Sequence, residues 1–354
     1  MQITRWTISL VVCLVPTMMS ASAQQSSGNP FSREAACRTL ELASTGGPLP
    51  ADRNVVVLRW LATSNFEIAY RDNVFLLDTY YDRAAPARPL GFDFKRMNKA
   101  TAIFVGHAHS DHASDAVAVA QQTGARVFGG PPTYDFVRAG GLPEKQAVLT
   151  RGGETFKFNG VTVQAILAHH SDRPGDQFRQ AGEGFRQITG ALIRPRTAEE
   201  QAHATAIGAR GSRDPSLAKQ GTIAYLFTFD NGFRVYYQDS AGPLTEAQME
   251  LMKTIPNVDV AIVPYQGFYL SEPQILATMP LIRLVKPRIV VPNHHDETGG
   301  SFPDLATEPL FMAIRDGLPG TRTYSLLYRS PMCINTSTGQ VFVGPGDAGP
   351  TGRR

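Results

Sequence analysis

The stretch Thr101-Ala102-Ile103-Phe104-Val105-Gly106-His107-Ala108-His109-Ser110-Asp111-His112 decides the fold. It opens with an apolar run that predicts a strand, and it ends in three histidines and an aspartate. Side chains on an extended segment repeat their direction every two residues, so His107 and His109 can bind the same ion. Asp111 and His112 come where the chain turns into a helix predicted over 113–122, and from there they can reach a second ion. The pattern predicts a strand, a metal-binding turn and a helix.

Histidines gather at three places along the chain. Of eight in total, seven lie at or just past the end of a predicted strand. These are His107, His109 and His112, then His169 and His170, and finally His294 and His295. Core packing gives histidines no reason to collect at strand ends, whereas neutral imidazole and carboxylate are the usual ligands of Zn²⁺ and similar ions. The sequence therefore indicates one metal centre assembled from three segments.

For the ligands that come later in the chain, the sequence leaves some choices open. Counting along the preceding strand favours His170 as the ligand, with His169 packed beside it or supporting it. Asp239 closes a further strand, where a carboxylate is well placed to bridge two cations. His294 ends a third strand, and His295 is expected in a pocket or on the surface.

The rest of the sequence predicts a layered domain. Apolar and β-branched runs indicate three strands in meander order over 55–77 and hairpins over 156–163 and 222–237. Helices and strands then alternate through the C-terminal third, which favours a layered α/β domain over an all-β sandwich. Residues 171–220 show little apolar periodicity and are predicted to form a long inserted loop.

The N-terminus predicts a cleaved secretory signal over residues 1–23. One basic side chain precedes an apolar run over 6–19, and Ser20-Ala21-Ser22-Ala23 supplies a small-x-small cleavage site. An apolar run of this length, at about 1.5 Å per residue, falls short of a bilayer core of about 30 Å, so no stable membrane anchor is expected after cleavage. The mature protein is predicted to be periplasmic or secreted.

The mature chain is expected to begin with a mobile lead-in over 24–53, which is rich in Gln, Ser, Gly and Pro and carries one short helix around 33–42. A single domain over 54–345 and a tail over 346–354 follow. Cys13 would leave with the signal, so Cys37 and Cys333 remain, one near each end. In an oxidising compartment they could form a disulfide, and two unpaired thiols are the alternative.

The candidate residues together resemble the metallo-β-lactamase superfamily. Asp78, the His107-to-His112 motif, His170, Asp239 and His294 match its order and spacing over about residues 54–300. The segments Trp60-Leu61-Ala62-Thr63-Ser64-Asn65-Phe66, Val263-Pro264-Tyr265-Gln266-Gly267 and Lys286-Pro287-Arg288-Ile289-Val290-Val291-Pro292-Asn293-His294 resemble one branch of it. That branch holds the L-ascorbate 6-phosphate lactonases and the phospholipases D that cleave N-acyl ethanolamine phospholipids.

The resemblance implies a four-layer αββα sandwich with two divalent metal ions, expected to be zinc, at one edge. By position, His107, His109 and His170 would hold one ion, Asp111, His112 and His294 the other, and Asp239 would bridge the two. Asp78 matches an acidic residue that supports the ligands without binding metal. Asp111 or Asp239 would handle the proton in catalysis.

Two departures from the family pattern concern the substrate. The bridging aspartate follows Gln238 where glycine is usual, and Ser240 stands where threonine is common. The segment Leu61-Ala62-Thr63 lacks a substrate-side histidine that some relatives carry. The metal-binding set survives both changes, whereas a substrate cannot be assigned by analogy.

The expected function is hydrolysis of an ester, a lactone or a phosphodiester, because two divalent ions supply hydroxide at neutral pH. Export argues against the cytoplasmic substrates of other relatives. A β-lactamase is the first alternative, although Asp239 argues against it, and a non-catalytic metal- or partner-binding protein is the second. The formal charge of +3 gives no case for nucleic-acid binding. The expected partner is a small-molecule or lipid-derived substrate, and the oligomeric state is left open.

Overall fold

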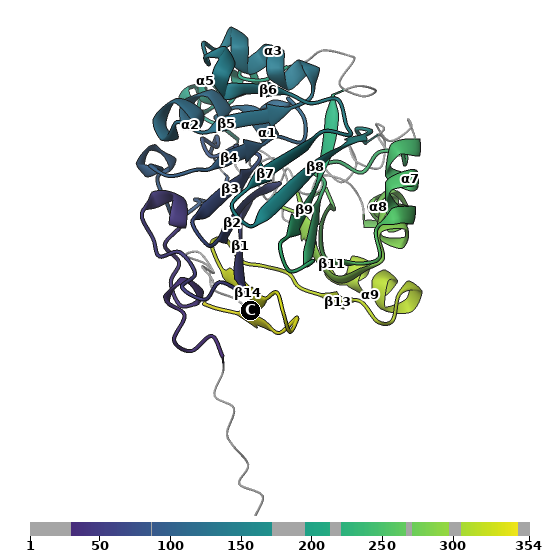
Figure 1. Ribbon diagram of the computed structural model, residues 1–354. Helices are drawn as coiled ribbons and strands as arrows, with labels where there is room; N and C mark the ends of the chain where they lie inside the picture. Colours follow the sequence, from purple (N-terminus) through teal and green to yellow (C-terminus); the bar gives the residue numbers. More distant parts are fainter. Residues whose placement is uncertain are drawn as a thin grey trace, which may run out of the picture.

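Two β-sheets pack face to face and carry helices on their outer faces (Figure 1). The structure is a computed structural model, and it describes residues 30–85, 87–171, 195–212, 221–266, 271–296 and 306–345. The predicted layered α/β sandwich with the layer order αββα is confirmed (Figure 1).

The first sheet has eight strands in the order β15-β14-β1-β2-β3-β4-β5-β6. Its strands are β1 (Val55–Ala62), β2 (Asn65–Tyr70), β3 (Asn73–Leu77), β4 (Ala102–Phe104), β5 (Arg126–Gly129), β6 (Ala147–Leu149), β14 (Pro331–Asn335) and β15 (Val341–Val343). The predicted meander is confirmed, because β2 pairs antiparallel with both β1 and β3. From β3 to β6 the strands run parallel. The connecting helices are α1 (Ser110–Ala113), α2 (Ala116–Thr123) and α3 (Pro131–Ala139).

The second sheet has seven strands in the order β13-β12-β11-β10-β9-β8-β7. They are β7 (Thr155–Phe158), β8 (Val161–Ala168), β9 (Thr222–Phe229), β10 (Arg234–Tyr237), β11 (Val258–Pro264), β12 (Pro287–Asn293) and β13 (Arg322–Thr323). Both predicted hairpins form. The helices α7 (Glu246–Thr254), α8 (Ser271–Val285) and α9 (Glu308–Gly317) alternate with these strands and lie on the outer side of the sheet (Figure 1).

An aromatic core joins the two sheets. Phe75 and Phe104 of the first sheet contact Phe227 of the second, with ring centroids 5.6 and 5.2 Å apart. Tyr225 lies 5.0 Å from Phe104 and donates its hydroxyl to the carbonyl of Val105 (3.0 Å). Such contacts add about 0.5–1.5 kcal/mol each beyond the area they bury. This packing fixes the end of β4, where the histidine motif begins.

The prediction of a mobile lead-in is wrong for the described part of that segment. Phe31, Leu42 and Ala43 are buried in the core. Within the stretch 33–42, where a short helix was predicted, one 3₁₀ turn forms, η1 (Ala35–Cys37), and a second, η2 (Ala43–Thr45), follows it. Buried Glu67 on β2 accepts hydrogen bonds from the backbone N–H groups that open η2. A polar average composition concealed the few apolar residues that anchor the segment.

Cys37 and Cys333 form a disulfide, with Cα atoms 5.9 Å apart. It joins η1 to β14, which pairs with β1, so the question left open by the sequence is resolved in favour of the bridge. The predicted signal over 1–23 and the predicted tail over 346–354 lie outside the described residues. In the part of the chain that is described, every helix is too short or too polar to span a bilayer.

The prediction of a long loop over 171–220 also needs correction. Residues 198–208 form a helix, α5 (Ala198–Gly208), and the flanking segments 172–194 and 213–220 lie outside the described residues. The helix begins with a capping box, in which Thr197 and Glu200 each bond the other's backbone N–H. Its missing apolar stripe hid it, because only a few of its side chains face the domain.

Candidate metal centre

The histidine motif leaves β4 through Gly106, where a side chain has no room. The backbone N–H of Gly106 donates to Oδ1 of Asp78 (2.8 Å). A Cβ at this position would overlap the carboxylate of Asp239. Glycine therefore lets the strand end lie directly against the carboxylate predicted to bridge two ions.

A first group of donors consists of His107, His109 and His170. Nε2 of His107 and Nδ1 of His109 lie 2.9 Å apart. Nδ1 of His170 bonds the carbonyl of Ser171 (2.8 Å), which leaves its Nε2 to the centre. The His170 ring lies 4.6 Å from that of His107 and 4.8 Å from that of His109. Three imidazoles arranged in this way could hold one metal ion.

A second group consists of Asp111, His112 and His294. Oδ2 of Asp111 lies 3.6 Å from Nε2 of His112 and 3.4 Å from Nε2 of His294. Both histidines are buried, whereas the Asp111 side chain has a relative exposure of 23%. The group is therefore closed on the protein side and open to solvent at Asp111.

Asp239 lies between the two groups. It forms a third cluster of donors with His107 of the first group and His112 of the second. Its Oδ2 is 2.7 Å from Nδ1 of His107 and 3.2 Å from Nδ1 of His112. Its Oδ1 is buried and has no hydrogen-bond partner among the described residues. An unpaired buried carboxylate oxygen costs free energy unless a cation or another donor meets it, so the donor set fits divalent metal.

Asp78 lies outside the three donor groups and contacts His112 of the second group. Its Oδ2 lies 2.7 Å from Nδ1 of His112 and accepts a hydrogen bond from the Tyr237 hydroxyl (2.7 Å). A carboxylate at Nδ1 favours the tautomer with the proton there, which leaves Nε2 of His112 free to bind metal.

Burial and charge set the protonation states. Burial is the main cause that lowers the pKa of His107 well below its usual range, and it lowers that of His109 to about 4. Burial alone would raise the pKa of Asp111, but the charges of His112 and His294 hold it well below its usual range. Burial raises the pKa of Asp239 against the opposing influence of nearby histidines. Burial would lower the pKa of His294, but the Asp111 carboxylate beside it raises that pKa. Neutral His107 and His109 and an ionised Asp111 are forms that bind cations.

Two candidates lie outside the donor groups. Nδ1 of His169 bonds the carbonyl of Pro243 (3.2 Å), and the residue belongs to none of the three donor groups. His295 is buried, and its ring stacks on Trp60 with centroids 4.3 Å apart. The unusual Gln238 turns into the second sheet's helix layer, where its Oε1 accepts from Tyr236 and Gln248.

Sequence reasoning missed the part that the insertion plays. The N–H of Ser212 donates to the carbonyl of Ala108 (2.7 Å) inside the histidine motif. Arg210 reaches both Asp82 (2.6 Å) and Asp115 (3.4 Å). The segment at the end of α5 therefore contacts the turn that carries the candidate metal donors. The composition of the insertion did not predict this contact.

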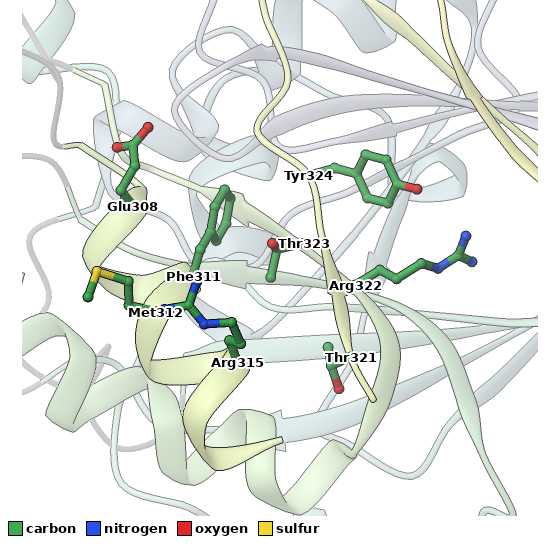
Figure 2. Close-up of a pocket in the computed structure, with 8 residues that line it drawn as sticks. All are labelled: Glu308, Phe311, Met312, Arg315, Thr321, Arg322, Thr323 and Tyr324. Atoms are coloured by element: carbon green, nitrogen blue, oxygen red, sulfur yellow. The ribbon is translucent and has the colours of Figure 1, made fainter. Parts of the chain in front are cut away.

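A separate hollow of about 520 Å³ lies between α9 and β13, at the far edge of the second sheet (Figure 2). Phe311, Arg315, Arg322 and Tyr324 are among the residues that line it. None of the candidate metal donors faces it, so it is distinct from the centre described above.

Comparison with known proteins finds metal-dependent hydrolases. Residues 73–209 match the beta-lactamase superfamily domain. A UPF0173 metal-dependent hydrolase of Myxococcus xanthus is 26% identical over 270 residues, which cover 76% of this chain and 79% of that protein. A UPF0173 metal-dependent hydrolase of Cupriavidus necator is 25% identical over 304 residues, covering 85% and 86%.

Solved structures of hydrolases share the fold of this chain. Igni18, a metallo hydrolase from Ignicoccus hospitalis, aligns with a TM-score of 0.53 at 19% identity, covering 79% of this chain and 98% of that one. An isothiocyanate hydrolase from Delia radicum gut bacteria aligns with a TM-score of 0.50 at 11% identity, covering 79% and 99%. The chain is a metallo-hydrolase with the metallo-β-lactamase fold. In this metallo-hydrolase the donor groups lie where strand ends of both sheets meet.

Proposed function

We propose that the protein is an exported hydrolase with two divalent metal ions, expected to be zinc, that cleaves an ester, a lactone or a phosphodiester. One observation carries the proposal: two triads of donors are linked through Asp239, which shares a cluster with a histidine of each. His107, His109 and His170 would hold one ion. Asp111, His112 and His294 would hold the other.

Bound ions would supply hydroxide at neutral pH and polarise the bond to be cleaved. The chain's own residues would then orient the substrate and handle the proton. Asp111 or Asp239 would handle the proton, and of the two only the Asp111 side chain is partly exposed. Substrate would enter beside His109, His170 and Asp111, since these are the donors that remain partly accessible.

Two features support export. The N-terminal sequence has the order of a cleaved signal, and the bridge between Cys37 and Cys333 is of a kind that persists in oxidising compartments. The resemblance of three segments to lactonases and phospholipases D supports lactones and phosphodiesters as substrates to try first.

The test is a matched pair of histidine variants. We expect His170→Ala to lose one of two bound metal ions and most of its turnover, because its ring completes the first triad. We expect His169→Ala to keep both ions, since its ring bonds Pro243 instead. Metal content per folded protein and turnover of lactones, phosphodiesters and nitrocefin are measured before and after chelation.

Two results would contradict the proposal. One is a wild-type protein that holds two ions and hydrolyses none of these substrates, which would favour a metal-binding role without catalysis. The other is full turnover after His107→Ala and His109→Ala are combined, because the first triad would then be dispensable.

A further inference from the structure

The corner between β1 and β2 has a strained backbone. Ala62 and Thr63 have φ angles of 100° and 49°, a region that residues with a Cβ seldom adopt. The metal donor His294 is also left-handed, with φ of 59°. Strain of this kind costs about 1–3 kcal/mol per residue and persists only where other contacts hold it.

The two strained segments hold each other through a pair of backbone contacts. The N–H of His294 donates to the carbonyl of Thr63 (2.7 Å). The N–H of Thr63 donates in turn to Oδ1 of Asp296 (2.9 Å). All three residues are buried. Thr63 is therefore fixed from both sides by the segment that carries the metal donor.

The carboxylate of Asp296 is itself fixed on its other oxygen. Oδ2 accepts a hydrogen bond from the Tyr328 hydroxyl and lies 3.3 Å from Nη2 of Arg83. Nη1 of Arg83 also donates to the Tyr328 oxygen (2.8 Å). A buried carboxylate with a cationic partner and two hydrogen-bond donors has little freedom to move.

Trp60 also contacts both segments of this cluster. Its Nε1 donates to the carbonyl of Thr63 (2.8 Å), and its ring stacks on His295. The segment from His294 to Asp296 is thus held at every residue, by Thr63, by Trp60 and by the pair formed by Arg83 and Tyr328.

We propose that Asp296 is a positioning residue that holds His294, through Thr63, in the geometry needed to bind the second metal ion. The inference rests on the proposed two-metal function. It assigns a role to the departure at Leu61-Ala62-Thr63, which positions a ligand from its backbone. In the described residues, the hydrogen bonds of His107, His109 and His170 do not involve this cluster, so the first ion is expected to be independent of it.

The experiment compares Asp296→Ala and Asp296→Asn with Glu67→Gln. The control is matched in kind, because Glu67 is also fully buried, accepts two backbone N–H bonds and lies beside an arginine, Arg59 (3.9 Å). Its contacts tie down η2 and do not reach the centre. Metal-free samples are titrated with Co²⁺, and visible absorption and thermal unfolding are recorded for each variant.

We expect wild type and Glu67→Gln to bind two equivalents of Co²⁺. Asp296→Ala should bind the first equivalent normally and the second about 10–100-fold more weakly, the usual effect of losing a group that orients a ligand. Asp296→Asn should retain more of the second affinity, because its Oδ1 can still accept from Thr63. It also keeps the comparison available should Asp296→Ala fail to fold.

Three results would overturn the inference. Unchanged binding of both equivalents in the Asp296 variants would remove the role of Asp296. Equal loss of both equivalents, or the same loss in Glu67→Gln, would show a general effect of destabilisation. A wild-type protein that binds fewer than two equivalents would contradict the proposed two-metal function itself, and the inference with it.

Discussion

At the scale of single residues, backbone conformation matters around the centre as much as donor chemistry. Thr63, Asp78 and His294 are all left-handed although none is glycine, with φ between 49° and 59°. Each is held by a buried backbone bond, such as the one from the N–H of Asp78 to the carbonyl of Phe104 (2.9 Å). These contacts hold strained residues in and beside the candidate metal centre, and backbone strain is common at functional sites.

The first prediction concerns Gly106. We expect Gly106→Ala to weaken metal binding by at least about tenfold, because the new methyl group would displace the Asp239 carboxylate that it overlaps. The fold should survive, with a loss of about 1–3 kcal/mol in the free energy of unfolding, as is usual for overpacking. Metal content after dialysis measures the first effect, and denaturant unfolding measures the second.

Gly320→Ala is the matched control, because a Cβ there would meet open space. It should change neither the bound metal content nor the free energy of unfolding by a measurable amount. If Gly106→Ala retains bound metal as well as this control does, the contact between Gly106 and Asp239 has no role in metal binding.

Residue chemistry explains what the sequence could predict at this scale. His107, His109 and Asp111 stand close together in the chain and have side chains that suit metal, so spacing alone brings them to notice. Asp296 and Tyr328 are far apart in sequence and act through backbone contacts that only the folded chain creates. Spacing therefore indicated the donors, and the residues that orient them stayed hidden.

At the scale of elements, the centre forms where strand ends from both sheets meet. The first histidines follow β4 in the first sheet. His170, Asp239 and His294 follow β8, β10 and β12 in the second. Alternation of strands with turns was readable from the sequence, because hydrophobic periodicity marks each strand. The short strands β13, which pairs with β12, and β15, which pairs with β14, could not be predicted. Two or three residues are too few to show a hydrophobic period.

Helix α5 in the insertion shows where hydrophobic periodicity fails to predict a helix. Helix α5 has polar residues on most of its surface, and Ile207 is its one buried residue. Its start was nevertheless encoded, because Thr197 followed by Glu200 is the pattern of a capping box. Its docking combines a small apolar cluster, in which Ile207 packs with Tyr80 and Ala84, with charges, since Arg210 lies near both Asp82 and Asp115. Neither contact leaves a periodic signal in the sequence.

The second prediction tests this docking. We expect Arg210→Ala to loosen α5 from the turn that carries the metal donors, and to lower the free energy of unfolding by about 1 kcal/mol, since the arginine is partly exposed. Limited proteolysis should then cut within 195–212 faster than in wild type. Lys253→Ala removes an exposed pair with Glu250 on α7 and serves as the control. Equal cutting rates in the two variants would count against the docking role.

At the scale of the whole molecule, the two ends of the described chain are joined. β14 pairs with β1 from the opposite end of the sequence, and the disulfide between Cys37 and Cys333 closes the same edge. The sequence raised this bridge as one of two options, because two cysteines remain after the predicted signal. Their proximity could not be read from it, since residues separated by 296 positions meet only through the sheet.

The last prediction follows from that closure. A bridge across 296 residues restricts the unfolded chain strongly, so Cys333→Ser should lower the free energy of unfolding by about 3–5 kcal/mol under oxidising conditions. Metal content and turnover should stay at wild-type values, because the bridge lies on η1 and β14, away from every candidate donor. Denaturant unfolding with and without reductant measures the effect, and wild type under reductant should approach the variant. Identical unfolding curves for oxidised wild type and Cys333→Ser would mean that the bridge contributes nothing to stability. A full complement of reactive thiols in the purified, non-reduced protein would mean that the bridge does not form.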